Sequence, residues 1–438
     1  MDSCLDFVDF YSVNLFLHGE YLLMSVIKPF KALKPSSQTA AKVASVPYDV
    51  VNIEEARQAA EGNPLSFLRV TRSEIELEPN TDPYSPNVYL KAKENLQRLI
   101  SKAPLKADES DHFYLYRLIM DGRAQTGIAA TYSVDDYDNN VILKHEKTRK
   151  VKEDDRTNHI VTTCAQTGPV FLTYKPVKAI DKIVDETIKN VKPLFDFIST
   201  DGIKHTIWVL PDKFNKSLID EIGNVKNLYI ADGHHRAASA SRAREVKREA
   251  NPNHSGKEEY NYFLAVLFPA DQLIILPYNR IVIDLNGKGK DEFLNDVSER
   301  FIIEKTGSKQ PEKQKTYGMY LDGEWFMLKP RDSVLASNSL SKSLADTLDV
   351  SVLQDFLLNP VLGIDDPRTN KRIDFVGGIR GTNELEKLVN SGKAAVAFSL
   401  YPVSVSNLMN ISDAGEIMPP KSTWFEPKLR DGLLVHLI

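Results

Sequence analysis

Five consecutive residues near the middle of the chain, Asp232 to Arg236, combine a carboxylate, a glycine, two imidazoles and a guanidinium. They stand between an apolar run at 228–231 and an alanine-rich stretch with helical spacing, which predicts a buried strand that turns directly into a helix. Gly233 permits a tight turn, and the first helical turn leaves backbone N–H groups at the positive end of the helix dipole. The pattern therefore predicts a site for a phosphate or a carboxylate group.

Each side chain of this turn suits a part in such a site. Arg236 supplies a bidentate donor, and His234 and His235 supply hydrogen-bond donors or carry protons. Asp232 can orient a hydroxyl group or bind Mg²⁺. The structural alternative is that Asp232 only caps the helix and the histidines pack as hydrogen-bonded polar residues. A zinc site on His234 and His235 is disfavoured, because neighbouring helical residues diverge by roughly 100° and no third ligand has a suitable spacing.

A second group of ionisable residues lies upstream, in the segment LKHEKTRKVKEDDR at 143–156. His145 and Glu146 come at the end of a predicted strand, and five Lys or Arg residues follow between Lys147 and Arg156. A carboxylate beside an imidazole is a candidate acid–base pair, and Arg156 is a candidate phosphate ligand. The alternative is the solvated start of a charged helix.

Three weaker signals lie elsewhere in the chain. The segment LSFLRVTR at 65–72 is interpreted as a strand that directs Arg69 and Arg72 to opposite faces, so that one of them reaches a ligand. Lys421 follows two prolines in MPPKSTWFEPK and is a candidate phosphate ligand on a pocket wall, with Trp424 and Phe425 interpreted as core. The glycines of DFVGGIRGTNEL match no P-loop or dinucleotide fingerprint and are interpreted as an ordinary turn.

The elements that must position these residues alternate between strand and helix along the whole chain, which predicts an α+β (mixed α/β) fold. We place borders near 107 and 284, which gives an N-terminal α/β segment at 24–106, a core at 107–283 that holds the turn, and a C-terminal α/β segment at 284–438. Residues 1–23 are apolar but interrupted by acids, and we interpret them as a dispensable extension or a mis-assigned start.

Composition narrows the class of protein. The chain has 438 residues, 55 basic and 60 acidic, with a net charge of −5. This near balance disfavours nucleic acid as a partner, because duplex-binding proteins carry a basic excess. Only Cys4 and Cys164 are present, which excludes a disulfide framework and favours a reducing, cytoplasmic location. No uninterrupted apolar run of membrane-spanning length occurs, so no membrane association is expected.

The segments YIADGHHRAASA, NPLSFLRVTR, LKHEKTRKVKEDDR, PVFLTY, PYNRIV and MPPKSTWFEPKLRDGL together identify the chain as a member of the domain-of-unknown-function family 1015. The Asp-Gly-His-His-Arg turn also resembles the core motif of the wider ParB/sulfiredoxin-like fold. That resemblance implies a ParB/sulfiredoxin-like core with large N- and C-terminal elaborations and a nucleotide bound at the turn.

Departures within the turn separate the members of that fold. Sulfiredoxins carry a cysteine where this chain has His234, which excludes thiol chemistry at that position. ParB-type turns carry Glu or Arg in place of the two histidines. The turn is similar letter for letter to that of free-serine kinases, whose upstream His-Glu pair resembles His145 and Glu146. The resemblance implies that Glu146 accepts the proton of a substrate hydroxyl.

The resulting hypothesis is a free-serine-kinase-like phosphotransferase that acts on a small hydroxylated metabolite such as an amino acid. Gly233, Arg236, Arg156, Lys421 and Arg69 are the candidate nucleotide-binding residues, and Glu146, His145, Asp232, His234 and His235 the catalytic ones. ATP or ADP and Mg²⁺ are the expected cofactors, and a homodimer is an expected assembly. The alternatives are a nucleotide-binding, ParB-like regulatory protein without turnover and a phosphodiester hydrolase.

Overall fold

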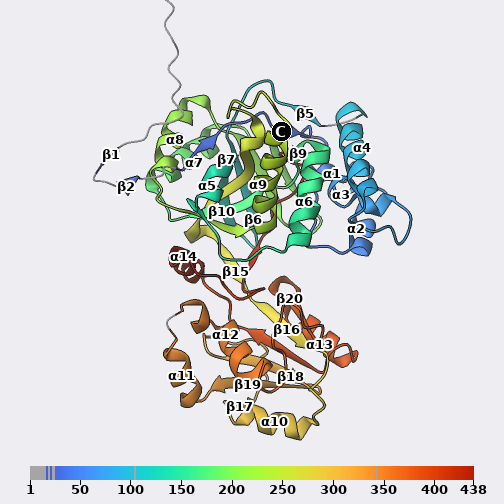
Figure 1. The fold of residues 1–438 in the computed structure, drawn as a ribbon, viewed down its shortest axis with the longest axis vertical. Coiled ribbons are helices and arrows are strands. Elements are labelled where there is room, and N and C mark those ends of the chain that lie inside the picture. Colours follow the sequence, from blue (N-terminus) through green and yellow to red (C-terminus); the bar gives the residue numbers. More distant parts are fainter. Residues whose placement is uncertain (1–15, 18–19, 22–24, 103–104, 342) are drawn as a thin grey trace, which may run out of the picture.

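The computed structural model of the chain describes all residues except 1–15, 18–19, 22–24, 103–104 and 342. Figure 1 shows two lobes stacked along the long axis, with the C-terminus in the upper lobe. The upper lobe is built on a nine-stranded sheet and the lower lobe on a six-stranded sheet, and helices accompany both. The α+β fold class expected from the sequence is therefore confirmed.

The upper sheet has the strand order β11-β12-β6-β7-β14-β10-β13-β8, and β3 pairs with β7 beside this path. All its pairs are antiparallel except β10 with β14 and β13 with β8. Its strands are β3 (Ile27–Lys28), β6 (Tyr114–Met120), β7 (Arg123–Ser133), β8 (Ile142–Leu143), β10 (Val170–Tyr174), β11 (Phe195–Ile198), β12 (Lys204–Val209), β13 (Leu228–Asp232) and β14 (Tyr262–Pro269).

The central strand β7 is buried on both of its faces. Successive side chains point to opposite faces, so Ile128 and Ala130 pack into one apolar cluster while Ala129 packs into another. The helices α7, α8 and α9 cover the first cluster, and segments from near the two ends of the chain cover the second. Helices on one face of the sheet and segments from near the chain ends on the other thus hold in place the sheet that carries the Asp-Gly-His-His-Arg turn.

Nine helices of the described residues surround this sheet. They are α1 (Ala40–Val43), α2 (Ile53–Ala60), α3 (Leu68–Thr71), α4 (Pro86–Lys102), α5 (Val134–Asp138), α6 (Lys150–Thr163), α7 (Lys178–Asn190), α8 (Asn215–Gly223) and α9 (His234–Glu249). Helix α2 begins after Asn52, which closes a capping box with Glu55. None of the helices in the described parts of the chain is long and apolar enough to cross a membrane.

The interpretation of LSFLRVTR as a strand is wrong. The segment forms the short helix α3 followed by a 3-10 turn at Ser73–Glu76. Phe67 and Val70 lie three residues apart and pack into one apolar cluster, while Leu68 packs into another, which is a helical and not an alternating pattern. The burial of these apolar residues in the folded protein therefore outweighs the β-propensity of the segment.

The lower lobe is an antiparallel sheet in the order β17-β19-β18-β21-β16-β20. Its strands are β16 (Tyr278–Val282), β17 (Phe301–Lys305), β18 (Tyr317–Leu321), β19 (Glu324–Pro330), β20 (Ile373–Gly377) and β21 (Val396–Leu400). Its helices are α10 (Lys290–Ser298), α11 (Asp332–Ser339), α12 (Asp349–Leu353) and α13 (Gly381–Asn390). The glycines of DFVGGIRGTNEL form the turn between two elements of this lobe, since the segment folds as β20, a 3-10 turn and the start of α13.

After the lower lobe, the chain runs back to the upper one. Helix α14 (Val405–Asp413) leads to β22 (Trp424–Glu426), which pairs with β15 (Ile274–Leu276) between the lobes. Beyond β22, Asp431 bridges to Ser45 and Val435 to Leu33, and β23 (His436–Leu437) pairs with β9 (Ala165–Gln166). One apolar cluster that includes Phe171, Phe425 and Phe398 joins both lobes.

Strand pairing crosses both of the predicted domain borders. Strand β3 from the 24–106 segment joins the upper sheet, and β4 (Leu33–Lys34) pairs with β5 (Lys106–Ala107) across 106/107. Strand β16 belongs to the lower sheet although it precedes 284. The three-segment division stays a prediction. Of residues 1–23, only the strand pair β1 (Phe16–Leu17) and β2 (Glu20–Tyr21) is described, so the interpretation of this stretch as an extension lies otherwise outside the described residues.

The returning segment depends on a glycine. Gly432 has φ +85°, and a Cβ atom placed on it would lie 2.5 Å from Cγ of Phe67, a fully buried side chain. Gly432→Ala should lower the free energy of unfolding by about 1–2 kcal/mol for the left-handed backbone and a further 1–3 kcal/mol for the collision. Urea unfolding measures the loss. Gly202→Ala is the control, because Gly202 has φ +81° and open space around it; equal losses in the two variants would contradict this packing.

Candidate functional site

The Asp-Gly-His-His-Arg turn has the predicted strand–turn–helix geometry. Strand β13 ends at Asp232, Gly233 adopts φ +94°, and α9 begins at His234 with no side chain capping its N-terminus. The backbone N–H of Gly233 donates to Oδ1 of Asp232 at 2.8 Å. The first turn of α9 therefore presents backbone N–H groups without intrahelical partners, which can bind an anion, and the fixed Asp232 carboxylate adjoins them.

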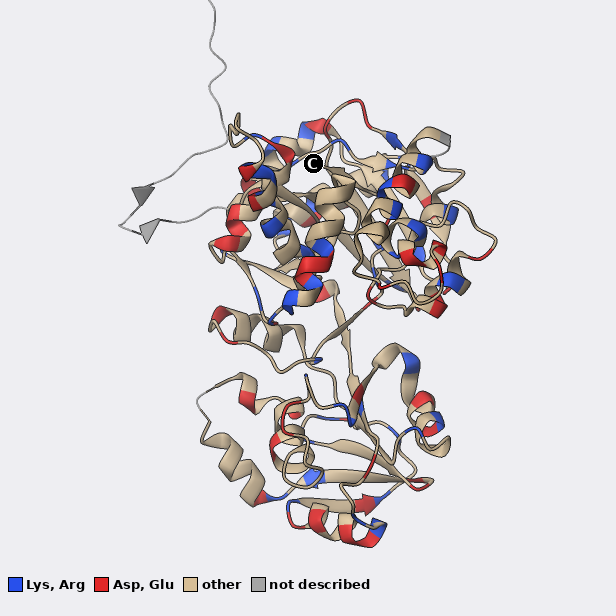
Figure 2. Cartoon of the chain, turned by 45° about the vertical axis from the view of Figure 1, so that its right-hand side comes forward, with Lys and Arg blue, Asp and Glu red and all other residues tan. Residues whose placement is uncertain are grey.

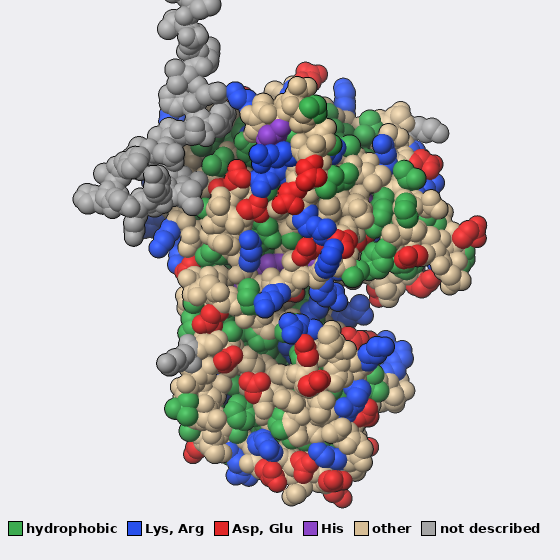
Figure 3. Space-filling view, in the orientation of Figure 1, with side chains coloured by type: hydrophobic (Ala, Val, Ile, Leu, Met, Phe, Trp, Pro, Cys, Tyr) green, Lys and Arg blue, Asp and Glu red, His purple; other side chains and the backbone are tan. Residues whose placement is uncertain are grey.

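A pocket of about 100 Å³ opens beside this turn. Five parts of the chain that are distant in sequence form its wall, and the returning C-terminal segment contributes more residues than any other part. The lining residues are Asp49, Val50, Glu146, Ala231, Asp232, His234, Tyr278, Lys421, Thr423, Trp424, Phe425 and Lys428. In the space-filling view of Figure 3, basic side chains gather along the waist between the two lobes on the face shown. Elsewhere acidic and basic residues are interspersed along both lobes (Figure 2).

Asp232 is held ionised by buried cations. Its Oδ2 lies 3.0 Å from Nζ of Lys428 and 3.5 Å from Nη2 of Arg236. Burial favours the protonated acid, but the charges of Lys428 and Arg236 outweigh it and hold the pKa of Asp232 well below its usual range. Burial in turn disfavours the Lys428 ammonium, yet Asp232 and Glu426 raise the pKa of Lys428. The pair thus stays charged at neutral pH.

The two histidines of the turn hold the loop that carries Glu146. The backbone N–H of His145 donates to Nε2 of His234 at 3.4 Å, and that of Arg149 donates to Nε2 of His235 at 3.1 Å. Burial lowers the pKa of His234 to about 3 and also lowers the pKa of His235. Both rings are therefore neutral near pH 7, as acceptors of backbone N–H groups must be.

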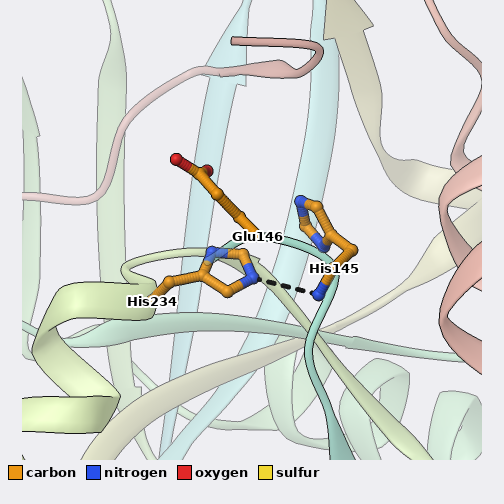
Figure 4. Close-up of side chains that lie close together, drawn as sticks. All are labelled: His145, Glu146 and His234. Carbon is orange, nitrogen blue, oxygen red and sulfur yellow. Dashed lines mark hydrogen bonds between the residues drawn. The ribbon is translucent and has the colours of Figure 1, made fainter. Parts of the chain in front are cut away.

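His145 and Glu146 reach the turn from the loop after β8. The rings of His145 and His234 meet edge to face with their centroids 4.4 Å apart, and Glu146 extends beside them (Figure 4). Burial raises the pKa of Glu146, although the charges of Lys421 and His235 oppose this. The structure gives the Glu146 carboxylate no hydrogen bond to the residues it describes, and the side chain lines the pocket. A carboxylate in this setting is free to accept a proton from a bound molecule.

The three arginines predicted to bind phosphate lie outside the pocket. Arg236 donates to the carbonyl of Pro169 and lies behind the turn, where it lines a second cavity of about 30 Å³ together with Arg156. Arg156 pairs with Asp155 at 3.0 Å. Arg69 pairs with Glu76 and also donates to the backbone carbonyls of Asn63 and Ala60. Arg236 therefore stabilises the turn from the side away from the pocket. Arg156 and Arg69 stabilise the segments that they contact.

The C-terminal segment supplies residues that sequence analysis missed. Lys428 was not singled out, and Trp424, interpreted as core, lines the pocket with its ring 5.1 Å from that of Tyr278. Lys421 lines the pocket with its Nζ 5.4 Å from the centre of the Tyr278 ring. The density of polar and aromatic residues in MPPKSTWFEPK was the one signal that pointed to this wall.

The chain belongs to the family described as Protein of unknown function (DUF1015), whose model matches residues 27–351. Lys421, Trp424 and Lys428 lie beyond the matched residues. No match to the chain was found among curated proteins.

Three solved structures illustrate what the fold is similar to. A free serine kinase variant in complex with AMP is 10% identical, and the match covers 70% of this chain and 92% of that one with a TM-score of 0.34. SbnI with a C-terminal truncation, from Staphylococcus aureus, is 11% identical over 70% and 87% of the two chains, with a TM-score of 0.36. A conserved hypothetical protein from Pyrococcus furiosus is 13% identical over 71% and 95%, with a TM-score of 0.32.

The Lys428–Asp232 pair offers a direct test of the turn. Lys428→Met should leave the Asp232 carboxylate half-buried without its closest cation and destabilise the protein by about 3–5 kcal/mol, the usual cost of breaking a buried pair. Asp232→Asn combined with Lys428→Met should recover part of that loss, because neither charge then remains unpaired. Urea unfolding of the two single variants and the double variant measures the coupling. Strictly additive losses would show that the two groups do not stabilise each other.

Behind the turn, Asp431 is a buried carboxyl group whose Oδ1 has no hydrogen-bond partner in the part of the chain that the structure describes. Burial raises its pKa from 3.8 to about 8, with a further increase from Asp49 and opposition from Arg236 and Arg156. Between about pH 4 and 8 the folded protein then binds one proton more than the unfolded chain, so this group makes stability fall as pH rises.

Asp431→Asn removes that proton linkage. The variant should gain stability relative to the unmodified protein as pH rises from 5 to 8, by at most about 1.4 kcal/mol per pH unit. Thermal unfolding of both proteins across this range measures the difference. A difference that does not change with pH would place the titration of Asp431 outside this window.

Proposed function

We propose that the chain is a phosphotransferase that moves a phosphoryl group from ATP or ADP to the hydroxyl group of a small metabolite, such as an amino acid. The observation that carries the proposal is the Glu146 carboxylate, which borders the pocket without a hydrogen-bond partner among the described residues and next to the uncapped start of α9. A base, an anion site and a pocket for a small molecule thus adjoin one another.

Phosphate groups of the donor would bind to Lys421 and the first N–H groups of α9. Lys421 is exposed on the pocket wall, and no carboxylate of the described residues forms an ion pair with it. Arg149 lies close enough to Glu146 to lower its pKa. Its guanidinium group is therefore a second positive charge beside Glu146. Phosphoryl transfer depends mainly on positioning and neutralisation of charge, which these groups supply. The basic waist in Figure 3 would draw an anionic nucleotide toward the pocket.

In the transfer itself, Glu146 accepts the proton of the acceptor hydroxyl. The hydroxyl oxygen forms a bond to the terminal phosphorus of the nucleotide, and the bond from that phosphorus to the bridging oxygen breaks, so the shortened nucleotide leaves with the electron pair. Asp232, fixed by Gly233 and Lys428, keeps the start of α9 in place. The histidines act by fixing the loop of Glu146.

The expected Mg²⁺ at Asp232 does not fit the residues around it. Oδ1 already accepts the N–H of Gly233, and Lys428 and Arg236 both approach Oδ2. Mg²⁺ prefers carboxylate oxygens and waters in a nearly octahedral shell, which two adjoining cations would disfavour. We therefore assign to Lys428 the neutralisation of Asp232 and derive no step through a metal ion at this residue.

The test is product formation from ATP or ADP with a panel of amino acids and sugars. Glu146→Gln should lower kcat by roughly 10²–10⁴-fold, the usual contribution of a general base, while nucleotide still binds. Glu94→Gln, on the exposed surface of α4, is the matched control and should keep full activity. Nucleotide binding without any product would support a regulatory protein instead, and phosphodiester cleavage that depends on His234 would support a hydrolase.

A further inference from the structure

Three potential metal ligands converge at the side of the pocket. His145, Glu146 and His234 each place one ligand atom within 4.8 Å of the others. Two come from the loop after β8 and one from the start of α9, so the group exists only in the folded chain (Figure 4). Glu146 and His234 also line the pocket, which leaves that side open to a further ligand.

His145 gives an independent indication of a ligand. Its side chain is 2% exposed, and neither ring nitrogen makes a hydrogen bond of standard geometry to the residues that the structure describes. The carbonyl of Ile230 lies close to the ring, although outside that geometry. Buried polar atoms without partners are rare and costly. A metal ion on one nitrogen and the Ile230 carbonyl near the other would satisfy both, since metal-bound histidines usually donate their second N–H to a carbonyl or carboxylate.

We propose that His145, Glu146 and His234 form a binding site for a divalent transition metal ion of the Zn²⁺ class. Two imidazoles and one carboxylate, with one position open, are the ligand set of catalytic zinc sites, and at His234 the metal would replace the 3.4 Å hydrogen bond that Nε2 accepts from the His145 N–H. Imidazole nitrogen favours Zn²⁺ or Co²⁺ over Mg²⁺, which prefers oxygen ligands. Tetrahedral ligands about 2.1 Å from a metal lie roughly 3.4 Å apart, so the three atoms must approach one another by about an ångström.

The Glu146 side chain supplies most of that approach. Its carboxylate end lies to one side of both rings in Figure 4, and rotation about its side-chain bonds can bring one oxygen toward them. The Asp232 carboxylate lies close enough to His145 to interact with its ring electrostatically, and its negative charge favours a cation at this place. Lys421 opposes it from the pocket side.

A metal ion at this site would occupy the carboxylate that accepts the proton in the proposed phosphotransfer. Metal binding and transfer would then exclude each other, and Zn²⁺ would inhibit. Only this expected inhibition by Zn²⁺ rests on the proposed function. The metal site itself stands on the three ligands and the unpartnered ring of His145.

The experiment is a titration of the metal-free full chain with Co²⁺, without nucleotide, followed by visible absorption and by competition with Zn²⁺. We expect one Co²⁺ per chain and an intense band from a site of low coordination number. His145→Asn and Glu146→Gln should each weaken binding by at least about 10- to 100-fold, as loss of a direct ligand does more than loss of a supporting residue. His254→Asn removes the histidine of the His254–Glu258 pair on another surface and should leave binding unchanged.

Thermal unfolding of every variant distinguishes loss of a ligand from loss of the fold, and bound Zn²⁺ should raise the Tm of the unmodified protein but not that of His145→Asn. Absence of stoichiometric binding, or equal binding by a folded His145→Asn variant, would overturn the site. Phosphotransfer assays are run separately on metal-free protein, so failure of the metal site leaves the proposed function untouched and the reverse also holds.

Discussion

The structure around the pocket depends on the return of the C-terminal segment to the upper lobe. This segment brings the Lys428 ammonium to within 3.0 Å of Asp232, a residue 196 positions earlier in the chain. A carboxylate at the end of a buried strand is costly unless a cation accompanies it, and Lys428 and Arg236 provide that charge from two sides. The turn, the first amides of α9 and the pocket wall are thereby fixed as one unit.

The second constraint is the attachment of the 145–149 loop to the two histidines of the turn. Backbone N–H groups of His145 and Arg149 donate to imidazole nitrogens, which must be neutral to accept them. Burial keeps them neutral by lowering both pKa values. Glu146, between the two attachment points, is thus placed at the pocket with its carboxylate free. The histidines that sequence analysis considered as proton carriers hold the loop of a neighbouring acid through these hydrogen bonds.

Charge is distributed in two layers around the turn. In front, Glu146, Asp232 and Lys421 line the pocket. Behind, Arg236 and Asp431 line the smaller cavity, and Nε of Arg236 and Oδ1 of Asp431 have no hydrogen-bond partner among the described residues. Low dielectric behind the turn strengthens each of these interactions, and it also makes every unpaired group expensive. Arg236 behind the turn and Lys428 at the pocket together hold Asp232, and Glu146 and Lys421 remain available to a ligand.

The sequence by itself determined the local structure of the site. An apolar run, a glycine and an alanine-rich stretch predict a strand, a tight turn and a helix, because each preference acts within a few residues. The α+β class and the family followed in the same way from patterns along the chain. The strand expected at Arg69 failed because its apolar residues are buried on a helical spacing that propensity does not reveal.

Only the tertiary structure decided which side chains meet. Lys428 reaches Asp232 and His145 reaches His234 across 196 and 89 residues, and such contacts leave no periodic signal in a single sequence. For the same reason Arg236, adjacent to the turn in sequence, was expected to face a ligand but lies behind it. The direction of a side chain at a helix start depends on what packs against it, here the Pro169 carbonyl and the returning C-terminal segment.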